Sequence, residues 1–266
     1  MASAHPAMAS TAPTFDVIGQ PVHGVTPSTA LTVMEQAVAA GRSAFVCFAN
    51  VHGLVLARQD AELRRAYAEA LLVAPDGMPL VWVGRRAGVA VERVYGPDMA
   101  LEACGLAARR GWPVYFFGGG NGVARSFAET ARALYPALMI AGVETPPFAP
   151  LDAERVAREA AAIARSGARV VLVGLGCPKQ EIWMRLAAPH APGVLMLGVG
   201  AAFDFHTGRV RQAPEWMMRS GLEWLYRFVQ EPRRLWRRYL VNNPVFVVLV
   251  LRQLVRGRDH RPVLRA

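Results

Sequence analysis

The sequence lacks the features that mark several common protein classes. Only three of its 266 residues are cysteines, too few and too scattered for a disulfide framework or a cysteine-based zinc site. No Asp-x-Asp pair is present, and Lys179 is the single lysine. The most apolar window, residues 245–251, is far shorter than the ~20 residues that span a bilayer. The first 14 residues do not follow the basic-then-apolar pattern of a signal peptide. We therefore expect reduced cysteines and a cytoplasmic protein.

Positive charge is concentrated at one end of the chain. Residues 209–266 hold 13 arginines and four acidic residues, whereas the preceding residues are nearly neutral. Basic segments favour polyanions such as a diphosphate, an anionic lipid surface or a nucleic acid. We predict a disordered lead-in at 1–14, an α/β domain at 15–208, a basic helical appendage at 209–256 and a tail at 257–266.

Hydrophobic patterning predicts an α/β fold, with a Rossmann-like, mainly parallel sheet and helices on both of its faces. The expected strands are 15–18, 44–49, 114–117, 138–141, 169–173 and 194–199. The expected helices of the main domain are 26–40, 51–58, 60–72, 78–86, 99–110, 123–134 and 151–165. An Arg-rich appendage should follow, with helices at 213–220, 221–230, 232–241 and 244–256.

Two polar residues stand where apolar segments end. Pro75-Asp76-Gly77 places a carboxylate in a tight turn, in which Pro75 fixes its own φ and Gly77 can adopt a positive φ. Asp76 is thus a candidate reactive group, although an aspartate is also common turn chemistry. Asn50 follows the strand expected at 44–49, at the sheet edge where α/β proteins bind ligands. A helix cap is an equally good explanation of Asn50.

Glycine-rich turns and polar residues follow the later strands. Gly118 and Gly119 open a loop that could bring backbone N–H groups to a phosphate, or that simply makes a tight turn. Lys179 and Gln180 lie at a helix start and can reach a ligand, and Asp204 follows the strand expected at 194–199. Asp98 is expected to cap the helix at 99–110.

Several of these motifs, taken in order, resemble the WecG/TagA/CpsF family of bacterial glycosyltransferases. The resemblance runs from about residue 15 to residue 252. It rests on Asn50, Pro75-Asp76-Gly77, Pro178-Lys179-Gln180-Glu181, the segment 198–204, the segment 221–227 and the segment 231–234. One position departs from the family, which usually has threonine two residues before the asparagine. Here that residue is Phe48, so the donor and acceptor sugars are left open.

The resemblance implies an activity and a role for each matching residue. The implied enzyme is metal-independent, uses no cofactor, and moves a sugar with inversion from a UDP-sugar to a polyprenyl-diphosphate-linked saccharide. It would work on the inner face of the cytoplasmic membrane, in the assembly of a cell-surface polysaccharide or teichoic-acid-type polymer. Asp76 would be the general base. The other implied site residues are Asn50 and Gln180 at the sugars, Asp204 at the ribose, and Arg227, Arg234 and Arg237 at the diphosphate, with Gly118, Gly119, Lys179 and Arg93 as further substrate-binding candidates.

Two other classes compete with this interpretation. A nicotinamide-dependent oxidoreductase would suit the strand and helix alternation, but the Gly-x-Gly-x-x-Gly fingerprint with its later acidic residue is missing. A non-catalytic module gripping anionic lipid or nucleic acid would suit the basic, aromatic appendage, but it leaves Asp76, Gln180 and Asp204 unexplained. We expect no nucleic-acid partner. The oligomeric state is open, with a homo-oligomer as one option.

Overall fold

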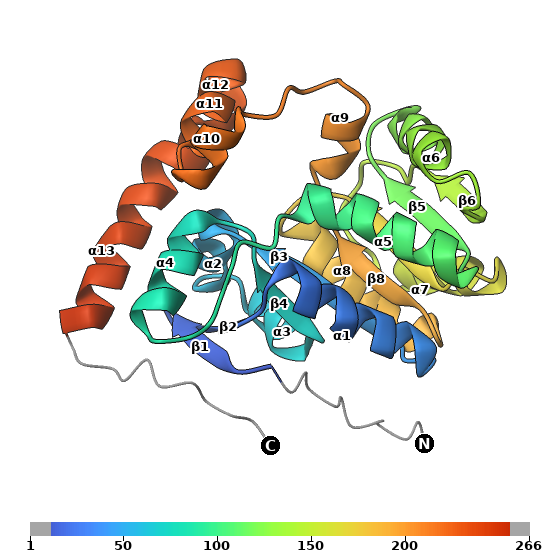
Figure 1. The fold of residues 1–266 in the computed structure, drawn as a ribbon, viewed down its shortest axis with the longest axis horizontal. Helices are drawn as coiled ribbons and strands as arrows, with labels where there is room; N and C mark the ends of the chain where they lie inside the picture. Colours follow the sequence, from blue (N-terminus) through green and yellow to red (C-terminus); the bar gives the residue numbers. More distant parts are fainter. Residues whose placement is uncertain (1–11, 256–266) are drawn as a thin grey trace.

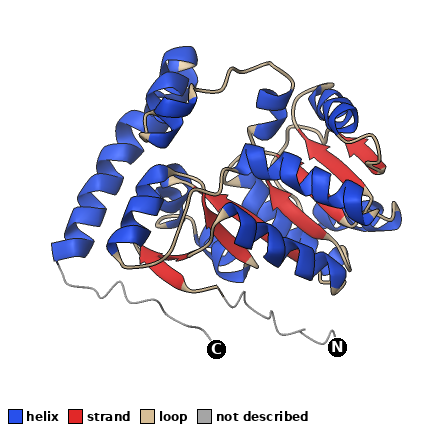
Figure 2. Cartoon of the chain, viewed as in Figure 1, coloured by secondary structure: helices blue, strands red, loops and turns tan. Residues whose placement is uncertain are grey.

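The computed structural model describes residues 12–255 (Figure 1). Most of the expected disordered lead-in and the expected tail lie outside these residues. The sequence predicted that the lead-in ends at residue 14, but Thr14 already belongs to a strand. The chain is an α/β protein with one main parallel sheet, helices on both faces and a helical C-terminal appendage (Figure 2). The predicted fold class is therefore confirmed.

The main sheet has six parallel strands in the order β4-β3-β8-β7-β5-β6. Its strands are β3 (Ala44–Ala49), β4 (Leu72–Pro75), β5 (Val114–Gly118), β6 (Ile140–Glu144), β7 (Val170–Gly174) and β8 (Leu195–Gly198). Because all six strands run the same way, their carboxyl ends lie along one edge of the sheet, with Asn50, Asp76, Gly118 and Gly198 at or next to these ends. This is the edge at which α/β proteins bind ligands.

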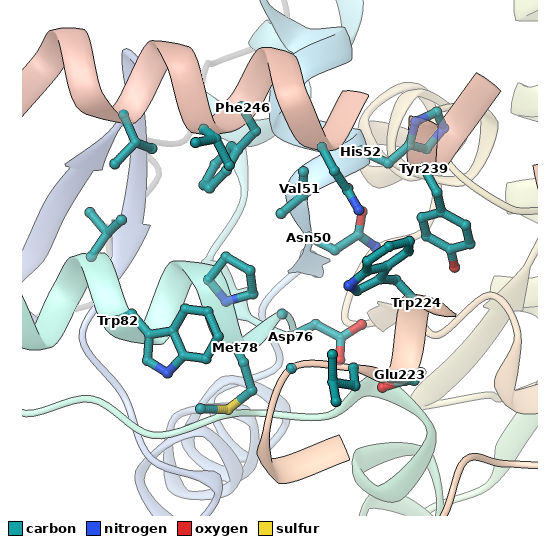
Figure 3. Close-up of a pocket in the computed structure, with 18 of the residues that line it drawn as sticks. Asn50, Val51, His52, Asp76, Met78, Trp82, Glu223, Trp224, Tyr239 and Phe246 are labelled. Carbon is teal, nitrogen blue, oxygen red and sulfur yellow. The ribbon is translucent and has the colours of Figure 1, made fainter. Parts of the chain in front are cut away.

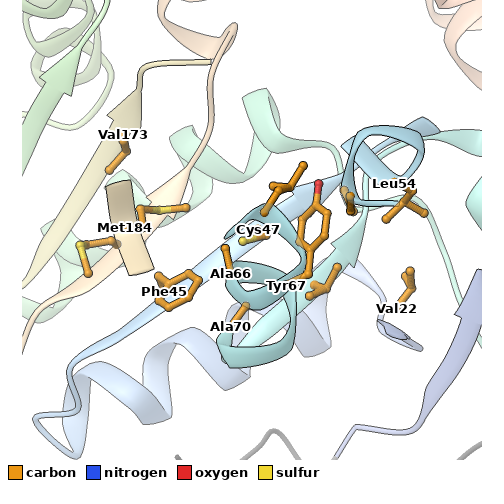
Figure 4. Packing of buried hydrophobic residues seen from close by; sticks show 14 of the residues in the cluster. Val22, Phe45, Cys47, Leu54, Ala66, Tyr67, Ala70, Val173 and Met184 are labelled. Atoms are coloured by element: carbon orange, nitrogen blue, oxygen red, sulfur yellow. The ribbon is translucent and has the colours of Figure 1, made fainter. Parts of the chain in front are cut away.

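Two apolar layers cover the faces of the sheet. The first packs α2 (Val51–Ala57), α3 (Ala61–Glu69), α4 (Met78–Arg86), α7 (Ala153–Arg165) and α8 (Lys179–Ala187). The second packs α1 (Pro27–Ala39), α5 (Gly96–Arg110), α6 (Val123–Leu134) and α9 (Ala202–His206). Successive residues of a strand point to opposite faces, so Phe45 and Cys47 join the first layer while Val46 joins the second (Figure 4).

Three local predictions were wrong. Helix α3 ends at Glu69, and strand β4 follows it, where the sequence predicted a helix through residue 72. Strand β1 (Thr14–Val17) pairs with an unpredicted antiparallel strand, β2 (Gln20–His23). Helix α5 begins at Gly96, so Asp98 lies in its first turn, and Tyr95 occupies the cap position.

The appendage forms an arm beside the N-terminal half of the sheet (Figure 1). It comprises α10 (Glu215–Arg219), α11 (Glu223–Gln230), α12 (Pro232–Trp236), a π-helical turn (Arg237–Val241) and α13 (Asn242–Val255). Gln253 fixes its far end, because its side chain accepts a hydrogen bond from the Ile18 N–H at 2.8 Å and donates to Asp16. Within residues 12–255, no helix is both long and apolar enough to cross a membrane.

Candidate active site

Asp76 is held at the carboxyl end of the edge strand β4 by hydrogen bonds that continue the sheet. Its N–H donates to the Ala49 carbonyl at 2.8 Å, and the Pro75 carbonyl accepts from the Val94 N–H at 2.9 Å. Gly77 then caps α4 with a φ of −93°, so the positive φ that its sequence would allow is not used. The carboxylate is therefore fixed by β4 and by the start of α4.

Asn50 occupies the equivalent place after the neighbouring strand β3. Its Oδ1 accepts the Gly53 N–H at 3.2 Å, which caps α2. The same side chain lines the cleft that contains Asp76. The capping role weighed from the sequence is thus confirmed, and it is compatible with a role toward a ligand.

Arg93 connects Asp76 with the appendage. Its Nη2 lies 3.6 Å from Asp76 Oδ1, its Nε donates to the Asp76 carbonyl, and its guanidinium also donates to the Glu223 carboxylate. Tyr95 donates its hydroxyl to the other oxygen of Glu223 at 3.3 Å and packs its ring 4.1 Å from the Arg93 guanidinium carbon. Two carboxylates, one from the main domain and one from α11, thus share a single arginine.

The surroundings of Asp76 set its basicity. Its side chain is 18% exposed, and Oδ1 has no hydrogen-bond partner among the described residues. Burial raises the pKa of Asp76 to about 6, which the charges of Arg93 and Arg227 oppose and the charge of Glu223 reinforces. A carboxylate with this pKa is mostly ionised near pH 7 and is a stronger base than an ordinary aspartate, as a general base requires.

The cleft around Asp76 has a volume of about 620 Å³ and lies between the sheet edge, α4 and the appendage (Figure 3). Trp224 of α11 and Tyr239 of the π-helical turn form part of its wall. Burial lowers the pKa of His52 to about 4, so its neutral ring accepts a hydrogen bond from the Asn242 amide at 2.6 Å. That bond joins α2 to the start of α13 and helps to close the cleft.

The three arginines proposed from the sequence are placed differently. Arg227 lines the cleft, with its guanidinium carbon 5.3 Å from the ring centroid of Phe205. Arg234 is exposed and pairs with Glu231 at 2.7 Å, and Arg237 is exposed beside Trp236. The break at the start of α12 turns these two arginines away from the face that carries Arg227.

The glycines after β5 lie at the same sheet edge but outside the cleft. Gly118 has a φ of +123°, and a Cβ there would lie 2.6 Å from the backbone of Gly174, so no other residue fits. Gly119 has a φ of +69°, and its N–H donates to the Gly174 carbonyl at 2.9 Å. Tight backbone packing therefore accounts for both glycines.

The remaining candidates surround β7 and β8. Gln180 is buried: its amide donates to the Gly198 carbonyl at 2.7 Å, and its oxygen accepts the Gly176 N–H at 3.1 Å. Lys179 lies 5.3 Å from the ring centroid of Phe148, and Asp204 is half-buried in α9. The structure thus brings Asn50, Asp76, Arg93 and Arg227 into one cleft. It leaves the candidates that follow β5, β7 and β8 outside that cleft, and it leaves Arg234 and Arg237 exposed on the appendage.

Sequence reasoning missed Glu223 and Arg238, which both line the cleft. A signal for Glu223 was present, because it precedes Arg227 by four residues and the two share one face of α11. Arg238 directly follows Arg237, which the sequence analysis proposed as a site residue. The π-helical turn that contains both residues directs Arg238 to the cleft and leaves Arg237 exposed. Within residues 12–255, no three histidine, cysteine or acidic side chains gather as metal ligands would.

A comparison with protein families agrees with this geometry. The model of the glycosyl transferase WecG/TagA/CpsF family matches residues 15–260, which include the whole main domain and the appendage. The match decides between the classes left open by the sequence, in favour of a glycosyltransferase. The chain belongs to the WecG/TagA/CpsF family of glycosyltransferases.

Proposed function

We propose that this protein is an inverting, metal-independent glycosyltransferase that moves a sugar from a UDP-sugar to a polyprenyl-diphosphate-linked saccharide. The product would serve cell-surface polysaccharide or teichoic-acid-type assembly. One observation carries the proposal: a half-buried carboxylate with a raised pKa, Asp76, lies in a cleft with arginines from both the main domain and the appendage. This arrangement suits proton removal beside a leaving diphosphate.

Asp76 is the general base in this mechanism. It accepts the proton of the acceptor hydroxyl as that oxygen attacks the anomeric carbon of the donor sugar. The bond from that carbon to the diphosphate oxygen breaks on the opposite face, UDP leaves, and the configuration inverts. A positioned base contributes roughly 10²- to 10⁴-fold to such a step.

Arginines stabilise the charge that develops on the departing diphosphate. Arg93 and Arg227 line the cleft, and Arg238 adds a third cation. Preorganised cations in a partly water-excluded site act most strongly on charge that appears in the transition state. Arg234 and Arg237 would join them through a movement of the appendage when substrates bind, since both are exposed in the structure.

The donor nucleotide occupies the other half of the sheet edge in this proposal. Gly118, Gly119 and Lys179, near the carboxyl ends of β5 and β7, would contact the nucleotide, and Asp204 would contact the ribose. Asn50 would contact a sugar directly. Gln180 would act through the loop it holds, because its amide already bonds to Gly176 and Gly198.

The appendage would dock on the inner face of the cytoplasmic membrane. Its helices expose large apolar side chains: Trp216, Leu225, Val229, Trp236, Leu240, Val241, Val245 and Val248. Exposed Arg233, Arg237 and Arg252 lie among them, and each basic residue near an anionic surface adds ~1 kcal/mol. Apolar and cationic side chains together favour interfacial binding without spanning.

The test is a panel of UDP-sugars offered with a polyprenyl-diphosphate-linked saccharide, with the product identified by its mass. The proposal expects one donor to add a single hexose or N-acetylhexosamine to the acceptor, with UDP released in equal amount. Transfer from no UDP-sugar, or transfer only to water, would contradict it. Anomeric analysis of the product then tests inversion.

A further inference from the structure

The cleft continues away from Asp76 as a groove between α4 and α13. The groove-lining residues of α4 recur on one helical face and are Met78, Pro79, Trp82, Val83 and Arg86. Those of α13 also share one face and include Phe246, Val247, Val250, Leu251 and Leu254. Figure 3 shows Phe246 on the side of α13 that faces α4. Trp82 extends from the other side of α4 in this view, and its ring lies against Gly221, which also lines the cleft. Two segments far apart in the sequence thus form one apolar channel.

The groove changes character along its length. Its near end holds the charged groups Asp76, Arg93 and Arg227, and Met78 adjoins this end, two residues after Asp76. Beyond Met78 the lining is apolar until Arg86 at the end of α4. At 1.5 Å per residue, the lining of α4 and the apolar lining of α13 each cover roughly 12 Å. A ligand that is charged at one end and apolar over the next stretch therefore matches the groove as far as Arg86.

Much of this apolar lining is exposed among residues 12–255. Trp82 is 49% exposed, Val247 is 54% exposed and Leu251 is 56% exposed. Phe246, by contrast, is buried against the main domain. Large apolar side chains that gather in a groove indicate a binding site. A nucleotide sugar has no hydrocarbon chain that could cover them, so another ligand is needed.

We propose that this groove binds the first isoprene units of the lipid acceptor, with the diphosphate held at the arginine end. The inference rests on the proposed function and assigns the lipid portion of the substrate to α4 and α13. The order of the lining, charged beside Asp76 and then apolar, matches the order of a polyprenyl diphosphate. The outward face of α13, with Val245 and Val248, is the face proposed to meet the membrane, so the rest of the lipid chain can pass from the groove into the bilayer.

Adjacent residues of α13 give a matched pair of variants. Val247 lines the groove, whereas Val248 lies on the outward face, and their exposed fractions are similar at 54% and 47%. Val247→Asp and Val248→Asp therefore add the same charge to the same helix at comparable cost to folding. Only Val247→Asp places a carboxylate in the path of the lipid.

The experiment measures binding of farnesyl diphosphate and of inorganic diphosphate to the full-length protein by calorimetry. The wild type should bind farnesyl diphosphate about 10-fold or more tightly than inorganic diphosphate, the gain expected from burying a few apolar groups. Val247→Asp should remove this difference, and Val248→Asp should retain it. Equal binding of the two probes by the wild type, or equal effects of the two substitutions, would overturn the groove assignment.

The same measurement separates this inference from the proposed function. If the affinity for farnesyl diphosphate depends on Val247 while no UDP-sugar supports transfer, the groove assignment is supported and the reaction assignment fails. If UDP-sugar transfer succeeds while Val247→Asp uses a long-chain acceptor with the wild-type KM, the reaction assignment is supported and the groove assignment fails. Circular dichroism of both variants checks that the appendage helices remain folded.

Discussion

Replacing Glu223 by glutamine should shift the pH dependence of the reaction. Glu223 reaches the cleft from α11 and accepts hydrogen bonds from Arg93 and Tyr95. Glutamine has nearly the same shape, keeps one oxygen that can accept from Arg93, and presents an amide N–H₂ that can donate to the Tyr95 hydroxyl oxygen. The substitution therefore removes the negative charge with little change in volume. Since that charge helps to raise the pKa of Asp76, Glu223→Gln should lower this pKa and move the acid limb of the rate profile to lower pH.

The size of the shift follows from the shared arginine. Arg93 Nη2 lies 3.6 Å from Asp76 Oδ1 and hydrogen-bonds to Glu223, so the nearest oxygens of the two carboxylates are at most roughly 6 Å apart. At an effective dielectric constant of ~20, two like charges roughly 6 Å apart repel by about 3 kcal/mol, which is equivalent to ~2 pH units, and the cation between them offsets part of this repulsion. Burial is the larger cause of the raised pKa, so we expect the midpoint to move from about 6 toward about 5.

The assay is kcat/KM for the lipid acceptor as a function of pH, because this ratio reports the groups that titrate in the free enzyme. Glu215→Gln is the matched control, since Glu215 lies on the same appendage and pairs only with the exposed Arg219 among the described residues. The control should leave the midpoint unchanged. An unchanged or raised midpoint in Glu223→Gln would refute the reasoning that Glu223 tunes Asp76.

Three further perturbations test other parts of the account. Because the pKa of Asp76 is about 6 in the folded protein against an ordinary value of 3.8, the folded state loses stability as pH rises through this window, by up to about 3 kcal/mol. Asp76→Asn should therefore raise the midpoint of thermal unfolding near pH 7 and have little effect below about pH 4; a lowered midpoint near pH 7 would contradict the buried-charge explanation. Arg227→Ala should reduce kcat by roughly 10²-fold, as for other lost transition-state donors, whereas the exposed Arg219→Ala should stay near the wild type; equal rates would remove Arg227 from the site. Co-sedimentation with anionic liposomes should weaken as salt rises, because exposed arginines are screened, and binding that ignores both salt and lipid charge would argue against the docking surface.

The sequence predicted most of the sheet because its central strands are continuous apolar runs. Residues 44–49 and 170–173 could be assigned from composition alone, since a strand buried on both faces needs no polar alternation. Strand β4 was not predicted because it is short, ends in Pro75 and follows α3 after only two residues. Its place at the edge of the sheet explains why a proline is tolerated there.

The sequence identified Asp76 and Asn50 as polar residues that follow apolar segments, but it did not show that they lie side by side. Their approach depends on the pairing of β3 with β4, and β4 was not predicted. Helical spacing alone could not show that Arg227 faces the cleft while Arg234 and Arg237 remain exposed, because the break at Pro232 and the π-helical turn reset the helix faces.

The aromatic residues of the appendage illustrate the same limit. Their spacing in the sequence is compatible with the core of the appendage and with a membrane-interface belt. In the structure, Trp224 and Tyr239 line the cleft, whereas Trp216 and Trp236 are exposed. The position of each aromatic residue relative to the cleft, which spacing alone does not give, separates the two groups.

Single-turnover transfer by Asp76→Asn tests the central claim most directly. With donor and lipid acceptor in excess of their dissociation constants, the account predicts a rate of product formation lower by roughly 10²- to 10⁴-fold, because an amide cannot accept the acceptor proton. Affinity for UDP, measured by calorimetry on the same preparation, should remain close to the wild-type value. Product formation by Asp76→Asn at a rate near that of the wild type would contradict the assignment of Asp76 as the general base.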